Sequence, residues 1–181
     1  MAWELNFLLW LQGMRSDLLT TLMVWYTSLG DHGLLWLGAT LLLLLGRKTR
    51  RAGIIGVLAL ALGALVTNVA LKPLVERLRP FIADPNLLPL VPIDDMSSFP
   101  SGHTTAAFGA ATGWFLSLPD TWRWRWTLFL TAVLMGVSRM YVGVHYPTDV
   151  LAGAVVGIAA GFLANYVAKQ IFAQKNLRNG E

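Results

Sequence analysis

The chain has 181 residues, of which 55% are hydrophobic and only 13% are charged, and its mean hydropathy is +0.56. This composition is typical of a membrane-embedded protein and argues against an ordinary soluble domain and a disordered or nucleic-acid-wrapping chain, despite the net charge of +4. The absence of cysteine excludes disulfide frameworks, zinc–thiolate sites, iron–sulfur clusters and a cysteine nucleophile. The length predicts a single membrane-embedded domain over residues 1–181.

Residues 1–30 are apolar but interrupted by polar side chains. The two apolar stretches, Trp3 to Gln12 and Leu18 to Leu29, carry or border charges such as Glu4 and Asp17. Such stretches form either two interfacial amphipathic helices or one weak first span, and the interruptions favour the interfacial helices. Because no basic residues precede the apolar stretch and no cleavage site follows it, we expect no signal peptide.

Five longer apolar windows follow, and a hydrocarbon core of about 30 Å requires roughly 20 apolar residues in a helix. They are Gly33 to Gly46, which extends toward Thr27; Ala52 to Leu71; Gly102 to Leu118; Trp126 to Val137, which can run on to Val144; and Val150 to Ala168. The windows predict an all-α, polytopic membrane bundle of five to six spans.

Small residues recur at helical spacing in two of these windows. The repeats are Gly109 and Gly113 in one window and Gly153, Gly157 and Gly161 in another. Glycines four residues apart line one face of a helix and let backbones approach closely in lipid. We therefore expect helix packing at these positions, within one chain or between chains, so that the sequence leaves the oligomeric state open.

Basic residues are divided unevenly between the two sides that alternating spans define. Nine of the fourteen Lys and Arg residues, but only two of the ten acidic residues, fall on the side that holds the 47–51 connection, the 120–125 connection and the tail 169–181. The positive-inside rule predicts that this side is cytoplasmic and that residues 81–99 form an extracytoplasmic loop. The basic and aromatic stretch DTWRWRW fits a headgroup belt better than single-stranded nucleic acid, because it lies beside two spans.

Three polar clusters lie at span ends on the outer side. In the first, KPLVERLRP, Lys72 ends a span and Arg79 follows seven residues later. If the segment after Pro73 is helical, seven residues make about two turns and both cations face the same way. Together an ammonium and a guanidinium can hold a phosphate dianion and stabilise the charge that develops during phosphoryl transfer.

The second cluster, FPSGH, opens an apolar helix. The backbone N–H groups of Ser101, Gly102 and His103 would be unpaired donors at the helix start, and such a start is an anion-binding site. His103 also brings a side chain that can protonate a leaving oxygen.

In the third cluster, SRMYVGVHYPTD, Arg139 precedes His145 by six residues and Asp149 follows His145 by four. A histidine beside a carboxylate has one nitrogen fixed as N–H, which leaves the other free to attack phosphorus. Singly, Arg139 could be a snorkelling anchor and Asp149 a helix cap. Because Arg139 and Asp149 lie with His145 on one side of the membrane, the grouping favours a phosphate site that needs no metal. The third histidine, His32, lies outside the three clusters.

These three clusters resemble, in order and without substitution at defining positions, the three motifs of the type 2 phosphatidic acid phosphatase family of membrane lipid phosphatases. The resemblance implies a core related to vanadium-dependent haloperoxidases and a metal-independent reaction through phosphohistidine, without a cofactor. It implies that His145 is the nucleophile, Asp149 its orienting partner and His103 the general acid. The phosphate-binding residues that it implies are Lys72, Arg79, Ser101, Gly102 and Arg139.

The resemblance also suggests a substrate and a location. A small single-domain chain with an outward-facing site is similar to bacterial undecaprenyl pyrophosphate phosphatases, with phosphatidylglycerol phosphate or phosphatidic acid as the alternative substrate. This implies a multi-pass protein of the bacterial inner membrane. Apolar residues in the 81–99 loop fit either a segment that dips into the outer leaflet to admit a lipid tail or a cap on the bundle. A small transporter is the alternative from another class, and it would require paired charges deep in several spans.

Overall fold

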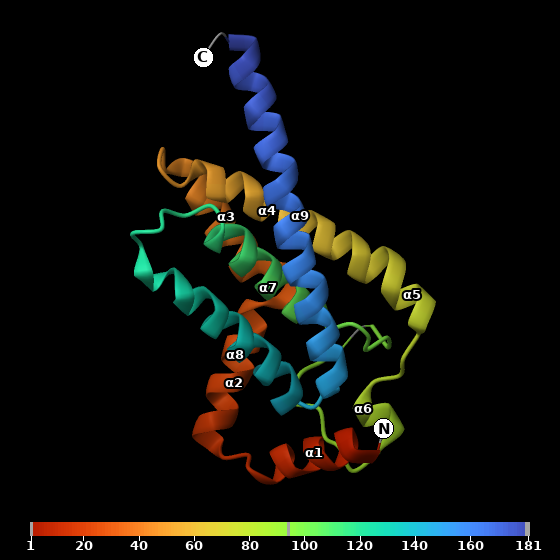
Figure 1. Ribbon diagram of the computed structural model, residues 1–181. Helices are drawn as coiled ribbons and strands as arrows, with labels where there is room; N and C mark the ends of the chain where they lie inside the picture. The colour runs from red at the N-terminus through yellow and green to blue at the C-terminus, as the bar shows by residue number, and fades with distance from the viewer. Residues whose placement is uncertain (1, 94, 180–181) are drawn as a thin grey trace.

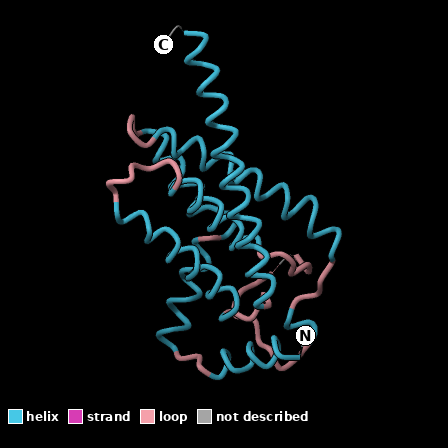
Figure 2. The backbone as a smooth tube through the Cα atoms, in the orientation of Figure 1, coloured by secondary structure: helices cyan, strands magenta, loops and turns pink. Residues whose placement is uncertain are grey.

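The computed structural model describes residues 2–93 and 95–179, and within these residues every regular element is a helix. This confirms the predicted all-α class. Figure 1 shows an elongated bundle in which α7 (Gly102–Phe115) lies at the centre, between α4 (Arg50–Ala64), α8 (Thr127–Tyr141) and α9 (Pro147–Asn179). Loops gather toward the two ends of the bundle (Figure 2).

The contact between α7 and α9 depends on glycine, as the sequence predicts. A Cβ atom added at Gly157 would lie 2.5 Å from the carbonyl oxygen of Thr105 and 2.8 Å from the backbone nitrogen of Gly109. One added at Gly153 would lie 2.6 Å from the carbonyl oxygen of Ser101. The glycines therefore bring α9 against the backbone of α7, within one chain.

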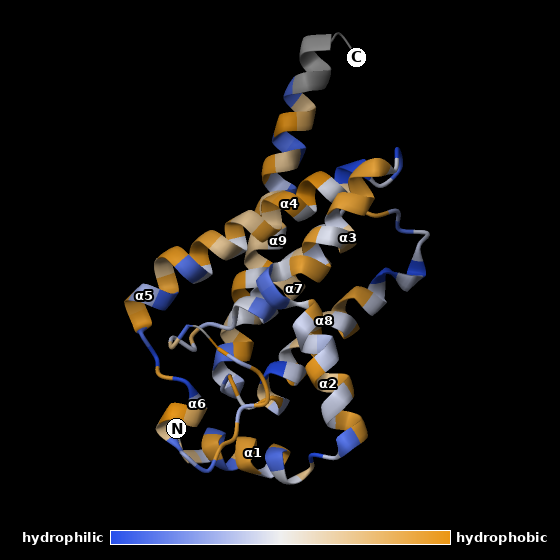
Figure 3. Cartoon of the chain, turned by 180° about the vertical axis from the view of Figure 1, so that it is seen from behind, coloured by the Kyte–Doolittle hydropathy of each residue, from blue (hydrophilic) through white to orange (hydrophobic). Residues whose placement is uncertain are grey.

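Two helical segments are long and apolar enough to cross a membrane by themselves. The first, Arg50–Val75, joins α4 to a π-helical stretch, η2 (Leu65–Leu71), and to α5 (Lys72–Val75); the second, Pro147–Gln174, lies in α9. A third candidate is a pair bent by 50°, Asp17–Leu29 with Asp31–Leu45. Apolar residues cover these helices in Figure 3. The chain is thus a multi-pass membrane protein, although five to six spans are not confirmed by these criteria.

The bent pair of helices does not fit the predicted interfacial position of the stretch Leu18 to Leu29. α2 (Asp17–Leu29) is separated from α3 (Leu34–Leu45) only by a short 3₁₀ turn, η1 (Asp31–Gly33), in which His32 has a φ of 52°. α2 packs along α8, and its Tyr26 hydroxyl donates to the carbonyl of Thr131 at 2.7 Å. An interfacial position for α2 is therefore not confirmed, whereas α1 (Ala2–Gly13) lies across the end of the bundle (Figure 1).

The segment after Lys72 is not the continuous helix that the sequence suggests. α5 ends at Val75, Glu76 adopts a left-handed φ of 46°, and Arg79 is extended with ψ of 153° before the short helix α6 (Pro80–Ala83). A residue that precedes proline is disfavoured in the α region, which accounts for the break before Pro80. Lys72 and Arg79 come together through this turn instead of through helical periodicity.

Residues 81–99 form a connection without further regular helices after α6, in its described part, 81–93 and 95–99. Most of its apolar side chains pack inward. Phe81, Leu90, Val91 and Ile93 contact a buried cluster of Tyr141, Val142 and Val144. The loop is therefore a cap on the bundle, although Leu88 is 61% exposed.

The last helix is longer than the predicted span, which ended at Ala168. α9 continues to Asn179, so most of the predicted tail 169–181 is helical, while residues 180 and 181 lie outside the described residues.

Candidate active site

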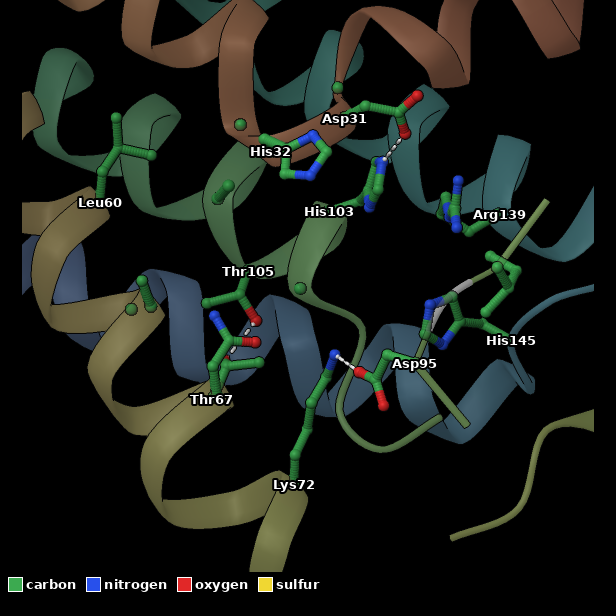
Figure 4. A pocket seen from close by; sticks show the side chains of 18 of the residues that line it. Asp31, His32, Leu60, Thr67, Lys72, Asp95, His103, Thr105, Arg139 and His145 are labelled. Atoms are coloured by element: carbon green, nitrogen blue, oxygen red, sulfur yellow. Dashed lines mark hydrogen bonds and ion pairs between the residues drawn. The ribbon is translucent and has the colours of Figure 1, made fainter. Parts of the chain in front are cut away.

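A cavity of about 540 Å³ opens where η1, the π-helical stretch η2, the start of α7 and the cap meet. Figure 4 shows side chains from these elements pointing into one space. All three predicted cations and both predicted histidines line it: Lys72, Arg79, His103, Arg139 and His145. Gly102 also lines the cavity, so the structure brings together residues from all three sequence clusters.

Arg79 connects the first cluster to the third. It is only 3% exposed, and its Nη1 donates to the carbonyl of Val144 at 2.9 Å and lies 3.3 Å from Nε2 of His145. Its Nε donates to the carbonyl of Asp95 at 2.6 Å. The guanidinium is thus fixed against the histidine that the sequence assigns as nucleophile.

Lys72 is paired with the carboxylate of Asp95 at the rim of the cavity. Burial alone would raise the pKa of Asp95, but the hydrogen bond from Lys72 and the nearby charges of Lys72 and Arg79 hold it below its usual value. Lys72, one of the cations that a phosphate would need, is therefore already paired with the carboxylate of Asp95.

Arg139 lies in the last turn of α8 and is 3% exposed. Its Nη1 donates to Thr27 Oγ1 at 2.8 Å, whereas its buried Nε has no hydrogen-bond partner among the described residues. A buried guanidinium with an unused donor beside a cavity can bind an anion.

His145 faces Asp149 with one ring nitrogen and the cavity with the other. Its Nδ1 lies 3.6 Å from Asp149 Oδ2, which is longer than a hydrogen bond, and its Nε2 faces Arg79. Burial lowers the pKa of His145 to about 4, and the charges of Arg139 and Arg79 add to this effect against the opposing effect of Asp149. The ring is therefore neutral at pH 7, with Nε2 as the nitrogen that can attack.

His103 stands on the opposite wall, at the first turn of α7. Its Nε2 lies 3.0 Å from Oδ1 of Asp31, which belongs to η1. The neighbouring His32 also lines the cavity, contrary to the expectation that this histidine lies elsewhere. The sharp turn between α2 and α3 brings both η1 side chains to the cavity, and no periodic pattern in the sequence could show this.

The N–H group of Ser101, predicted as a free donor for phosphate, is used within the protein. This N–H donates to the carbonyl of Asp149 at 3.0 Å, and the Ser101 hydroxyl accepts from the N–H of Thr104 at 3.4 Å and from the Thr104 hydroxyl at 2.9 Å. Ser101 is fully buried, so its groups cap α7 and join it to α9. The predicted set of three free donors therefore loses the Ser101 N–H, and Gly102 and His103 remain at the helix start.

Four further residues close to the site were not singled out from the sequence. Asp31 and Asp95 carry carboxylates to the cavity wall, Asn68 lines it from η2, and Arg77 donates to Asp149 Oδ1 at 2.6 Å. Arg77 has the clearest sequence signal, since it lies inside the first motif, two residues before Arg79.

The sequence is similar to those of known proteins. The model of the PAP2 superfamily matches residues 52–173. An undecaprenyl-diphosphatase of Sulfolobus acidocaldarius is 37% identical over 148 residues, which cover 81% of this chain and 69% of the relative. The undecaprenyl-diphosphatase BcrC of Bacillus subtilis is 40% identical over 115 residues, 62% of this chain and 53% of BcrC.

Solved structures show the same fold. The crystal structure of Aquifex aeolicus LpxE superposes with a TM-score of 0.78 at 31% identity and covers 91% of this chain and 95% of that one. A PAP2-type phosphatidylglycerolphosphate phosphatase from Bacillus subtilis superposes with a TM-score of 0.75 at 28% identity and covers 94% and 86% of the two chains.

Proposed function

The chain belongs to the PAP2 superfamily, and we propose that it is a lipid phosphatase that converts undecaprenyl pyrophosphate to undecaprenyl phosphate through a phosphohistidine on His145. The observation that carries the proposal is the buried His145, whose Nε2 opens on a cavity walled by Lys72, Arg79 and Arg139. A nucleophile among three cations suits an anionic phosphoryl group.

In the proposed reaction, His145 Nε2 attacks the terminal phosphorus. A P–N bond forms as the bond from phosphorus to the bridging oxygen breaks, and the bridging oxygen leaves on undecaprenyl phosphate with the proton of His103. His103 then takes a proton from water, whose oxygen attacks phosphorus and breaks the P–N bond. Inorganic phosphate is released and His145 returns to its neutral form. The residues named here hold or move every proton in this scheme, so it does not call on a metal ion or a cofactor.

Lys72, Arg79 and Arg139, with the N–H groups of Gly102 and His103, are the proposed phosphate clamp. Arginine suits the equatorial oxygens because its fork can donate two parallel hydrogen bonds. Ser101 supports the clamp by fixing the start of α7, because its N–H is paired with the carbonyl of Asp149.

One part of the cavity wall is apolar and suits a lipid chain. Leu37 of α3, Leu60 of α4 and Ala106 of α7 line it away from the cations. A long isoprenoid or acyl chain can lie there while its phosphate reaches His145. Undecaprenyl pyrophosphate is favoured by the two named undecaprenyl-diphosphatases. The second candidate is phosphatidylglycerol phosphate, which the structural match to the Bacillus subtilis phosphatase favours.

We further propose five membrane crossings: the bent α2 and α3 pair, the segment Arg50–Val75, α7, α8 and α9. α1 then lies on the outer surface as an interfacial helix, beside the cap and the catalytic cavity. The distribution of Lys and Arg supports this orientation, in the inner membrane of a bacterium, with the cavity on the extracytoplasmic side.

The proposal is tested by measuring phosphate release by the purified protein in detergent with EDTA present. Undecaprenyl pyrophosphate, phosphatidylglycerol phosphate and phosphatidic acid are assayed side by side, with wild type and His145→Ala. We expect the highest kcat/KM for undecaprenyl pyrophosphate, and a folded but inactive His145→Ala protein. Full activity of that variant would reject the histidine mechanism. A solute flux in liposomes that survives loss of all phosphatase activity would favour the transporter instead.

A further inference from the structure

A buried ionic cluster connects Asp149 to the N-terminal helix α1. Arg77 lies at its centre: Nη1 donates to Asp149 Oδ1 at 2.6 Å, and Nη2 donates to Glu4 Oε2 at 2.7 Å. The Asp149 side chain is fully buried, and those of Glu4 and Arg77 are only 4% and 18% exposed. Ion pairs at such depth require close geometry, because their charges have lost most of their water.

Two more residues hold the Arg77 guanidinium in place. Thr148 Oγ1 accepts from Arg77 Nη1 at 2.6 Å and itself donates to Glu4 Oε1 at 2.6 Å. The guanidinium carbon also lies 3.8 Å from the centre of the Tyr146 ring. Burial would raise the pKa of Glu4, but hydrogen bonds from Thr148 and Arg77 outweigh burial and keep the pKa below its usual value. Glu4 therefore stays ionised as the counter-ion of Arg77.

The cluster fixes the rotation of the Asp149 carboxylate. Oδ1 is bound by Arg77, while Oδ2 accepts from the N–H of Tyr146 at 2.9 Å and faces His145 Nδ1 at 3.6 Å. Because Arg77 binds Oδ1, only Oδ2 can accept a hydrogen bond from Nδ1 of His145. Arg77 itself is absent from the cavity wall, so it acts on the reaction only through Asp149.

We propose that Arg77 is a positioning residue for the reaction, which aims Asp149 Oδ2 at His145, and that Glu4 positions Arg77 in turn. Helix α1 is thereby part of the catalytic architecture. The inference rests on the proposed function of His145 as nucleophile and adds two residues outside the phosphate clamp.

The first test separates kcat from KM. Arg77→Gln removes the cation but keeps a hydrogen-bonding side chain, and we expect kcat to fall roughly 10- to 100-fold, the range of a hydrogen bond to a charged group, with KM unchanged. Arg77→Lys can reach only one of the two carboxylates and should lie between wild type and Arg77→Gln. Glu4→Gln should lower kcat by less than about tenfold. A raised KM with an unchanged kcat would instead mean that Arg77 binds substrate, and would overturn the proposal.

The second test is a double-mutant cycle with Asp149→Asn, because simple loss of folded protein also lowers apparent kcat. If Arg77 acts through Asp149, Arg77→Gln should change kcat less than about threefold in the Asp149→Asn background. An equal loss in both backgrounds would overturn the proposal. If Arg77→Gln does not fold, Arg77→Lys and Glu4→Gln decide the result in the same cycle.

Arg15→Gln is the matched control. Arg15 also ties the N-terminal region to the bundle, through the carbonyls of Leu88 at 2.8 Å and Tyr141 at 3.0 Å, but it does not contact Asp149. We expect it to lower Tm with the same small effect on kcat in both backgrounds. Phosphate release that persists in His145→Ala would count against the proposed function, whereas the cycle reports separately on Arg77.

Discussion

Nη1 of Arg79 lies 3.3 Å from Nε2 of His145 and donates at 2.9 Å to the carbonyl of the preceding residue, Val144. One guanidinium thus sets the backbone that carries the proposed nucleophile and stands where the transferred phosphoryl group would bind. Nucleophile and cation are placed together before substrate arrives, so little reorganisation is needed during reaction.

From this double contact we expect Arg79→Lys to lower kcat/KM by about 10²- to 10³-fold, the range seen when one preorganised donor is removed from a developing negative charge. A lysine cannot reach the Val144 carbonyl and a phosphate oxygen together. Steady-state kinetics on the preferred lipid should show the loss mainly in kcat. Arg123→Lys on the opposite side of the bundle is the control and should behave as wild type.

The low pKa of His145 predicts how activity and stability depend on pH. Burial lowers this pKa to about 4 in the folded protein, from an ordinary value of about 6.5. Between pH 6.5 and 4 the unfolded chain therefore binds more protons at this position. The free energy of unfolding should fall as the pH falls through this window, by about 3 kcal/mol in total from this group.

Thermal melts in detergent from pH 7.5 to 4 test this expectation, with His145→Asn as the control that lacks the group. Wild type should lose more Tm than His145→Asn. Activity should fall as the pH falls through the pKa of His145, because protonation of its ring removes the lone pair that attacks phosphorus. Equal melting shifts for both proteins, or activity that stays unchanged as the pH falls from 6 to 4, would contradict these assignments.

Residue chemistry and order along the chain were enough to predict the cations and two histidines of the cavity, but neither its carboxylates nor its construction. Lys72, Arg79, His103, Arg139 and His145 do line it, because each lies at or beside a helix end, where charge is tolerated in a membrane, whereas Asp149 lies behind His145. Lys72 and Arg79, however, meet through a left-handed turn at Glu76, since Pro80 stops the helix. The backbone conformation of Glu76 determines how these two side chains meet, and a hydropathy pattern does not predict the conformation of a single residue.

The two acidic residues of the cavity could not be predicted from the sequence for a different reason. Asp31 lies in a sharp turn and meets His103 across 72 residues of sequence, and Asp95 lies in the cap and meets Lys72 across 23. Taken alone, a carboxylate in a loop is typical of a solvated surface. Only the tertiary structure shows that two carboxylates line the cavity beside its cations, where a phosphate would compete with Asp95 for Lys72.

This competition predicts that Asp95→Asn strengthens phosphate binding. In the present structure Lys72 is paired with Asp95, so a substrate must displace the carboxylate before it can use the ammonium. An asparagine leaves Lys72 available, and we expect KM and the inhibition constant of inorganic phosphate to fall about 2- to 5-fold, the scale of a partly exposed ion pair. Lys72→Ala should raise both constants, and the double variant should resemble Lys72→Ala. An unchanged inhibition constant in Asp95→Asn would show that the pair does not compete with phosphate.

The last prediction concerns the contact that holds the start of α7 in place. A Cβ atom at Gly157 would lie 2.5 Å from the carbonyl oxygen of Thr105, a backbone atom that cannot move without shifting α7. Gly157→Ala should therefore push α9 from α7 and cost about 1–3 kcal/mol. Because α7 begins at Gly102 and His103, activity should fall together with Tm. Gly38→Ala is the matched control, since nothing lies within 4 Å of its added Cβ, and alanine is the better helix former. Thermal melts and kcat of the two variants, measured in the same detergent, should therefore diverge, and equal behaviour would show that α9 can adapt to the extra methyl group.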